Sequence, residues 1–427
     1  MPEPSLKASS ELRHVVLSEY YTVSEFLVLF RTTASSLGAG EGMEVSVNAQ
    51  LGRNIEFVVA VLSDPHASRI RALNWLYDGT AELDSIVALV TSNCVELASL
   101  KVLLRRMHTV DFLSDVLEHP RVGRTLRALY LPVLPKGDVA RFFAALGRSR
   151  VNQLSLCDGG SPDFYHRLHA YLERDLLVGL SVLFTQEQRV LETVALLAKC
   201  RRLCALKIGN CEFRHPSSTF AAGLSRSVAR LEFCDCTFLG DCGWLFLLAS
   251  DVQRLAFFNV DGINGTRLGY ALAARLKTSG LDVLDFFICN GVNETLAALG
   301  DELVHVRKLG VEYCGLDKTA LELIALALQC PGNRLRELHL SYDVRTLASM
   351  GAHLLPALNS PACKLGKVSF RNVFPVYDSS AETAAANFCK RLGLLTLLQG
   401  QQVRRQRPSQ LRRLPVELLR MVGPFIL

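Results

Sequence analysis

The chain has 427 residues, of which 49% are hydrophobic and 21% are charged. This balance excludes an intrinsically disordered protein, because the apolar residues suffice to build a large buried core. The net charge of +6 is too dilute over this length to indicate nucleic-acid binding.

The N-terminal residues 1–11 are expected to form a tail, since "MPEPSLKASSELRH" lacks the apolar stretch of a signal segment. No window approaches eighteen uninterrupted apolar residues, so no membrane association is expected. The thirteen cysteines are odd in number and follow no disulfide-framework spacing, which favours free thiols in a reducing compartment. We therefore expect a cytoplasmic protein, with the nucleus as the alternative.

From residue 12 onward, a hexapeptide of the form LxxLxL recurs along the chain, as in "LRHVVL" (12–17), "LCALKI" (203–208) and "LRELHL" (335–340). The second apolar residue of each copy, called the anchor below, falls at positions 15, 45, 73, 100, 129, 154, 180, 206, 231, 255, 284, 309, 338 and 368. The gaps run from 24 to 30 residues and average about 27. The chain is therefore built from internal repeats.

Each hexapeptide is followed by a polar or glycine-rich corner and then by a helical pattern, apolar at i, i+3, i+4 and i+7. The clearest helical patterns cover residues 186–200, 264–280 and 317–330. A strand of about four residues cannot bury its inner face alone, so neighbouring repeats must stack. This predicts a parallel sheet on one side and helices on the other, joined by right-handed crossovers.

On these residues the chain resembles the leucine-rich repeat family, most closely its ribonuclease-inhibitor-like and cysteine-containing subtypes. The resemblance implies an α/β solenoid of the horseshoe type, with about fourteen strand–helix units over residues 12–378. The parallel sheet is expected on the concave face and the helices on the convex face.

The family pattern extends to LxxLxLxxN/C, where an Asn or Cys turns inward at the corner that follows the strand. Five residues past an anchor lie Cys211, Cys236, Cys289 and Cys314, which are therefore expected to be structural. A zinc site is not expected, because the chain has no CxxC pair. Cys157 and Cys234 lie three residues past an anchor and are expected to point outward. Four further cysteines near repeat junctions are expected to pack inside, namely Cys94, Cys200, Cys330 and Cys363.

The concave face should display the residues one before, one after and three after each anchor. Exposed aromatic rings beside cations are typical of protein-interaction hot spots. The candidate partner-binding residues are Arg230, Arg254, Phe258, Phe287 and Lys308. The alternative is that the two rings lie against the corner and only complete the core.

After the last repeat, residues 379–403 are expected to form a helix that caps the open end of the solenoid. Residues 404–427 form a basic linker and a final helix, "LPVELLRMVGPFIL" at 414–427. This ending resembles the first helix of an F-box, LPxELLxxIxxFL, although it is much shorter than an F-box and contains Pro424. The matching residues are Leu414, Pro415, Glu417, Leu418, Leu419, Val422 and Phe425.

The F-box resemblance implies contact with a Skp-type adaptor of a cullin-type ubiquitin ligase, in which an amphipathic helix lies in a groove. No P-loop, GxSxG, HExxH or dinucleotide-binding motif occurs, so we expect neither an enzyme nor a cofactor or metal. The sequence predicts a protein–protein interaction module, as a substrate-recognition adaptor of such a ligase. The alternatives are a plain scaffold or inhibitor in which 414–427 is only a cap, or a structural assembly protein.

Overall fold

The computed structural model describes residues 13–16, 22–47, 54–77, 83–94, 96–104, 111–131, 138–157, 162–183, 197, 200–213, 228–239, 252–342 and 344–372. The predicted tail (1–11), most of the predicted helix 186–200, the capping helix and the F-box-like segment lie outside these residues. The chain forms two compact units, residues 1–209 and 210–427, and each is described by itself.

The first unit contains a parallel sheet whose strands follow one another in sequence order. Its strands are β1 Arg13–Val16, β2 Met43–Val47, β3 Ile70–Tyr77, β4 Ser99–Leu104, β5 Ala128–Leu131, β6 Gln153–Cys157, β7 Gly179–Leu183 and β8 Ala205–Gly209. Each predicted anchor is in register with the next, from Val15 opposite Val45 to Leu180 opposite Leu206. The repeat period therefore sets the register of this sheet.

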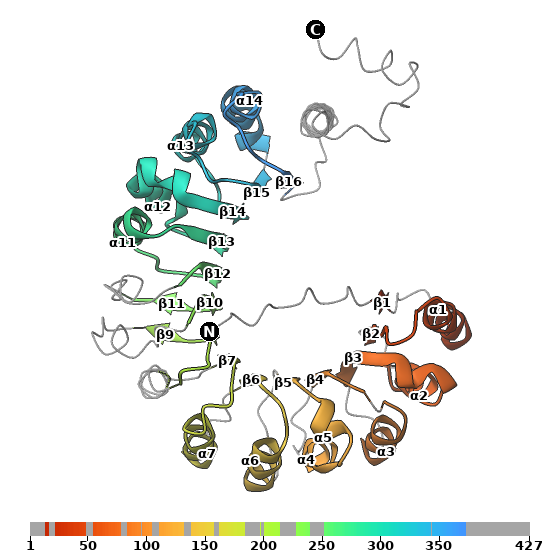
Figure 1. The fold of residues 1–427 in the computed structure, drawn as a ribbon. Coiled ribbons are helices and arrows are strands. Elements are labelled where there is room, and N and C mark those ends of the chain that lie inside the picture. The colour runs from red at the N-terminus through yellow and green to blue at the C-terminus, as the bar shows by residue number, and fades with distance from the viewer. Residues whose placement is uncertain are drawn as a thin grey trace, which may run out of the picture. The chain divides into compact units, whose positions relative to one another are not determined.

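The helices of the first unit connect successive strands and lie on one side of the sheet (Figure 1). They are α1 Val23–Ser35, α2 Asn54–Leu62, the 3₁₀ helix η1 Pro65–Arg69, α3 Leu83–Asn93, α4 Asp111–Glu118, α5 Val122–Thr125, α6 Val139–Arg148 and α7 Pro162–Leu172. Local sequence fixes where several of them begin. Thr22 and Glu25 form a reciprocal capping box at α1, and the Asp138 carboxylate accepts from the backbone N–H of Arg141 at α6.

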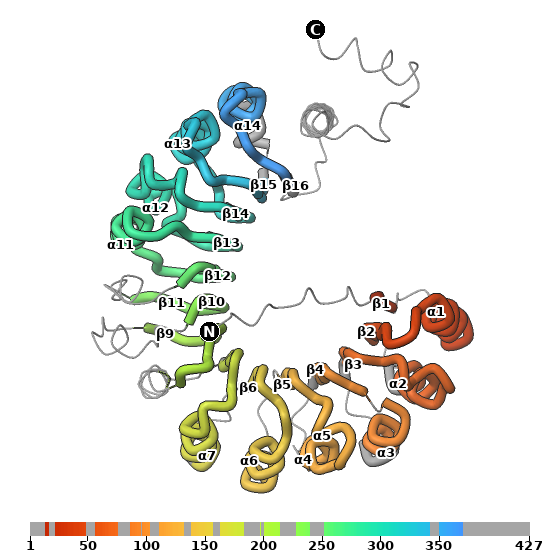
Figure 2. The backbone as a smooth tube through the Cα atoms, in the orientation of Figure 1, coloured from red at the N-terminus to blue at the C-terminus, as the bar shows by residue number. Residues whose placement is uncertain are grey.

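The second unit repeats this construction (Figure 2). Its main sheet contains β10 Arg230–Cys234, β12 Arg254–Val260, β13 Leu281–Cys289, β14 Val306–Glu312, β15 Glu337–Tyr342 and β16 Lys367–Asn372. A separate two-stranded parallel sheet pairs β9 Glu212–Phe213 with β11 Thr237–Phe238. The helices are α11 Gly265–Thr278, α12 Val292–Leu299, the 3₁₀ helix η2 Gly300–His305, α13 Lys318–Gln329 and α14 Val344–Leu358.

The sequence predictions for these elements are confirmed. The helices predicted at 264–280 and 317–330 are α11 and α13, and the anchors from Leu231 to Val368 pair in register. Each of the fourteen predicted anchors lies in a strand. Within each unit the architecture is the α/β repeat of parallel strands and covering helices that the sequence predicts.

The core of the second unit contains a stack of phenylalanines that crosses its strands. Phe257 lies between Phe233 and Phe286, with ring-centroid distances of 5.6 Å and 5.3 Å and interplanar angles of 12° and 6°. All three side chains are fully buried. Their positions, two residues past each anchor, follow from the alternation of side chains along a strand.

The chain turns away from the sheet through the left-handed region of backbone space, four residues past the anchor. The residues there with positive φ, between 52° and 59°, are Asn210, Asp235, Asn259, Ile288 and Tyr313. Asparagine and aspartate tolerate this conformation, whereas a β-branched isoleucine is strained in it. The repeat pattern in the sequence did not predict this left-handed residue four positions past the anchor.

Candidate functional site

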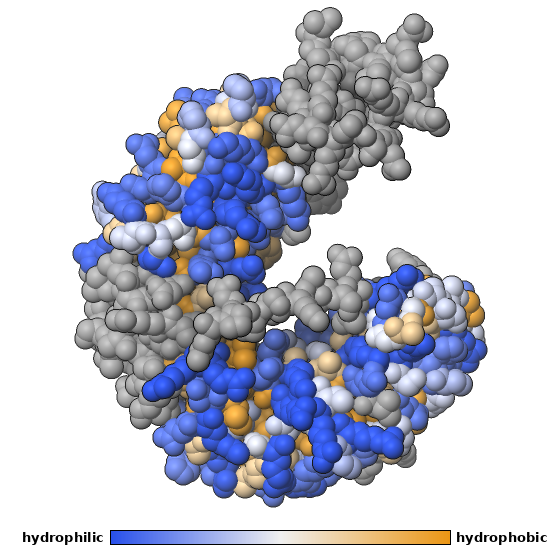
Figure 3. All heavy atoms as spheres, viewed as in Figure 1, coloured by the Kyte–Doolittle hydropathy of each residue, from blue (hydrophilic) through white to orange (hydrophobic). Residues whose placement is uncertain are grey.

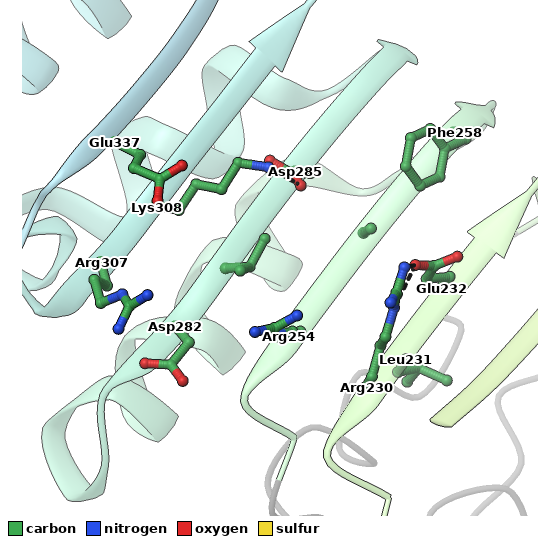
Figure 4. Close-up of a pocket in the computed structure, with 12 residues that line it drawn as sticks. Arg230, Leu231, Glu232, Arg254, Phe258, Asp282, Asp285, Arg307, Lys308 and Glu337 are labelled. Atoms are coloured by element: carbon green, nitrogen blue, oxygen red, sulfur yellow. Dashed lines mark hydrogen bonds and ion pairs between the residues drawn. The ribbon is translucent and has the colours of Figure 1, made fainter. Parts of the chain in front are cut away.

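A hollow lies on the sheet face of the second unit opposite the described helices, here called the open face (Figure 4). Its volume is about 290 Å³. It is lined by Arg230, Leu231, Glu232, Arg254, Ala256, Phe258, Asp282, Val283, Asp285, Arg307, Lys308 and Glu337. The hollow therefore spans strands β10 to β15.

The hollow exists because small side chains occupy its centre. Strand β12 presents Arg254, Ala256 and Phe258, which are in register with Val283, Asp285 and Phe287 of β13. Ala256 contributes only a methyl group, and the next strand has Gly310 opposite Asp285. The Asp285 carboxylate leans into the space that a side chain at position 310 would fill. The floor is apolar, with charged groups around it.

Two ion pairs flank the hollow. The Arg230 Nε lies 2.6 Å from the Glu232 Oε1, and the Lys308 Nζ lies 2.8 Å from the Asp285 Oδ2. Arg254 lies between them and is exposed, and no described residue forms an ion pair or a side-chain hydrogen bond with it. Arg254 is therefore a cation that an incoming anionic group can reach (Figure 4).

Three aromatic side chains lie near the carboxyl ends of strands β12, β13 and β14. The ring centroids of Phe258 and Phe287 are 6.2 Å apart, and those of Phe287 and Tyr313 are 5.2 Å apart in an edge-to-face arrangement. All three rings are half-buried. We call Phe258, Phe287 and Tyr313 the aromatic edge. The neighbouring Ile288 side chain is 46% exposed, which extends the apolar surface.

The structure brings four of the five predicted partner-binding residues together, since Arg230, Arg254, Phe258 and Lys308 all line the hollow. Phe287 lies on the aromatic edge instead. Their role in binding stays a prediction. The inward rings that precede them, Phe257 and Phe286, are buried as expected.

Sequence reasoning missed other residues of the hollow, chiefly Asp282, Val283, Ala256 and Arg307. Asp282 and Arg307 lie two residues before an anchor, outside the three rows that were considered. Ala256 lies one residue after its anchor, in a row whose side chains face outward. A small side chain at such a position was the feature of the sequence that could have indicated a hollow. Hydrophilic residues predominate on the visible edge of this unit, with apolar ones between them (Figure 3).

The alternation places Cys234 on the open face, as predicted, but the side chain is not exposed there. Cys234 is buried, with 7% exposure, because its small side chain lies in register with the bulky Phe258 of the next strand. The Cys157 side chain is outside the described residues. At the repeat junctions, Cys94 and Cys200 are buried as expected, whereas Cys330 and Cys363 are only half-buried.

The four corner cysteines bond to backbone groups, as predicted for a structural role. Cys236 donates to the carbonyl of Cys234 at 3.2 Å, and Cys314 donates to that of Glu312 at 3.1 Å. Cys289 donates to the carbonyl of Phe287 at 3.3 Å, while the Cys211 thiol lies 3.8 Å from that of Glu212. Burial raises the pKa of Cys236 to about 12, which keeps this thiol protonated.

The hollow is suited to binding rather than to covalent chemistry. Its lining contains arginine, lysine and carboxylate groups but no serine, cysteine, threonine or histidine that could act as a nucleophile with its base. Within the described ranges, no three metal-ligating side chains converge on one point. None of the helices that the structure describes has both the length and the apolar content needed to cross a bilayer.

Comparison with protein-family models gives no match, and comparison with curated proteins gives none either. Among solved structures, the TLR13–ssRNA13 complex matches over 80% of this chain with a TM-score of 0.42 and 11% identity. This chain spans 54% of that protein. An internalin (inlF) from Listeria monocytogenes matches over 74% of this chain and 94% of its own, with a TM-score of 0.34 and 14% identity.

Proposed function

We propose that this chain is a non-catalytic protein-recognition module whose binding surface is the hollow together with the aromatic edge. The observation that supports it is the position of Arg254, an exposed cation without an ion-pair partner among the described residues, between two cations that carboxylates already neutralise. Recognition sites commonly combine such an arginine with aromatic anchors.

The chemistry of β12 indicates the kind of segment that fits. Arg254, Ala256 and Phe258 lie along one face of this strand, so an anionic group at Arg254 places its neighbouring side chain over Ala256 and against Phe258. The matching partner is an extended protein segment with a carboxylate beside an apolar side chain. A charge-assisted hydrogen bond to arginine contributes about 1.5–3 kcal/mol, which is enough to select such a segment.

Peptide display on the full chain tests this proposal. Selected peptides are expected to be enriched in Asp or Glu next to Phe, Leu or Ile, and synthetic versions should bind in fluorescence anisotropy. Arg254→Ala and Phe258→Ala should each weaken binding at least tenfold. The control Lys277→Ala changes an exposed lysine of helix α11, on the other side of the sheet, and should leave binding unchanged. Selection of peptides without carboxylates, or equal binding by all variants, contradicts the proposal.

A more specific role follows from the C-terminal motif. We propose that residues 414–427 engage a Skp-type adaptor, so that the module presents its target to a cullin-type ubiquitin ligase. The support is the match at Leu414, Pro415, Glu417, Leu418, Leu419, Val422 and Phe425. Apolar residues at these spacings suit a helix-in-groove contact.

Co-purification of the full chain and of a version ending at Arg413 with a Skp-type adaptor and a cullin tests this role. Retention by the full chain alone supports the adaptor. If neither retains the adaptor and the shortened chain melts at a lower temperature, the segment is a cap and the protein is a plain scaffold or inhibitor. Leu418→Asp with Leu419→Asp in the full chain is the matched point variant and should lose the adaptor as the shortened chain does.

A further inference from the structure

Two cysteines of adjacent repeats lie side by side at the corner of the second unit. Cys289 is the last residue of β13, and Cys314 follows β14 by two residues. The strands are in register up to Phe287 and Glu312, and each cysteine follows two residues later along its own chain segment. The backbone N–H of Cys289 donates to the Sγ of Cys314 at 3.4 Å, so the Cys314 sulfur lies against the backbone of Cys289.

This geometry meets the requirements of a disulfide. Adjacent strands of a sheet are ~4.8 Å apart, which lies within the ~4.4–6.8 Å between Cα atoms that a disulfide bridges. The 3.4 Å contact between the Cys289 N–H and the Cys314 Sγ shows that the Cys314 side chain already points toward Cys289. Cys289 is 5% exposed, whereas Cys314 is half-buried, so a small reagent can reach the pair from the side of Cys314.

We propose that Cys289 and Cys314 form an oxidation site that hydrogen peroxide converts into an intramolecular disulfide. The Cys289 thiolate attacks one peroxide oxygen, the O–O bond breaks, and the departing hydroxide takes up a proton to become water. Two electrons pass from this sulfur to the peroxide, leaving a sulfenic acid on Cys289. The Cys314 sulfur then attacks the Cys289 sulfur, the S–O bond breaks, and the sulfenic hydroxyl leaves with the Cys314 proton as a second water.

The electrostatics assign Cys289 the role of the attacking thiol. The neighbouring Cys314 side chain lowers the pKa of Cys289 despite the opposing effect of burial. The proximity of Cys289, together with burial, raises the pKa of Cys314. The reactive thiolate is therefore the one that its neighbour stabilises, and the neighbour is the resolving thiol.

The bond joins the two corners that carry three of the four residues of the apolar surface described above. Phe287 and Ile288 precede Cys289, and Tyr313 precedes Cys314. Oxidation therefore fixes the spacing of Phe287 and Tyr313, whose rings are in contact. The oxidation site does not depend on the proposed partner, and its test requires none.

Mapping of cysteines by mass spectrometry tests the proposal on the full-length protein. The protein is treated with hydrogen peroxide, alkylated in denaturant without reductant, and digested with trypsin. Trypsin releases residues 278–307 with Cys289 as the only cysteine and residues 309–318 with Cys314 as the only cysteine. The expected product is the covalent pair of these peptides, lighter by two hydrogen atoms and separated by dithiothreitol.

Internal and variant controls make the result decisive. The peptide 319–334 contains Cys330 alone and should be found alkylated, and Cys330→Ser should form the cross-link as the wild type does. Cys314→Ser should abolish the cross-linked pair and leave a modified Cys289. The proposal is overturned if both peptides remain alkylated at a peroxide dose that oxidises the exposed Cys204, or if Cys289 links to another cysteine.

Discussion

The phenylalanine stack of the second unit offers a direct comparison of two adjacent residues on opposite faces of one strand. Phe257 is fully buried between Phe233 and Phe286, whereas Phe258 is half-buried on the open face. Truncating a buried phenylalanine to alanine costs ~3–5 kcal/mol, and the loss of two aromatic contacts, each worth about 0.5–1.5 kcal/mol, places Phe257 in the upper part of that range. Phe257→Ala should therefore lower the free energy of unfolding by about 4–5 kcal/mol.

Phe258→Ala should lower the free energy of unfolding much less than Phe257→Ala does. Half of the ~1.5–3 kcal/mol gained by burying such a side chain is about 1 kcal/mol. Urea unfolding followed by far-UV circular dichroism measures both, and hydrogen exchange shows whether the loss centres on β10 to β13, since repeats are stabilised by their neighbours. Equal losses for the two variants, or a loss below about 2 kcal/mol for Phe257→Ala, would refute the stacking argument.

Three further predictions concern corners and charges. Asn259→Val should lower the free energy of unfolding by about 2 kcal/mol in urea, because it places a β-branched residue at φ 52° and removes the 2.7 Å hydrogen bond to Asp235. The control Gln253→Val, on the same repeat, should have little effect. Gly262→Ala should lower the free energy of unfolding by more than about 2 kcal/mol, since φ is 70° and a methyl group would collide with the Phe238 carbonyl. Gly40→Ala, with φ 82° and open space around it, should lower it by only about 1 kcal/mol in the same urea unfolding. Burial opposes ionisation of Asp64, but hydrogen bonds from the His66 amide and from Arg31 lower its pKa below 3.8. The unfolded chain then binds this proton more readily, so stability should fall as the pH drops from about 5, and Asp64→Asn should flatten that decline in acid unfolding curves.

The sequence period predicted the strands and their register because a single constraint determines both. An apolar anchor every 24 to 30 residues must be buried beside its neighbours, and stacking leaves only one parallel arrangement. The same alternation correctly placed Phe257 and Phe286 inside and Arg254 outside. It placed Cys234 on the open face but could not predict its burial, which depends on the size of the neighbouring Phe258.

The hollow could be predicted only in part, because its depth and charge depend on pairs of side chains. The pairing of Arg230 with Glu232 and of Lys308 with Asp285 leaves Arg254 and Arg307 without an ion-pair partner among the described residues, and no repeat rule determines which cations are left. The low floor likewise comes from Ala256 and from the absence of a side chain at Gly310. Residues outside the considered rows, such as Asp282 and Arg307, complete the lining.

The strained corners supply an independent argument for recognition at the aromatic edge. Asn210, Asp235 and Asn259 have side chains that tolerate the left-handed backbone, whereas Ile288 and Tyr313 do not favour it. Strain of this kind costs on the order of 1–3 kcal/mol per residue and clusters at functional sites. Both exceptions occur in adjacent repeats beside Phe287, and both present apolar surface. Folding alone would be better served by asparagine at these corners, so the apolar residues there are most simply explained by what they contact outside the chain.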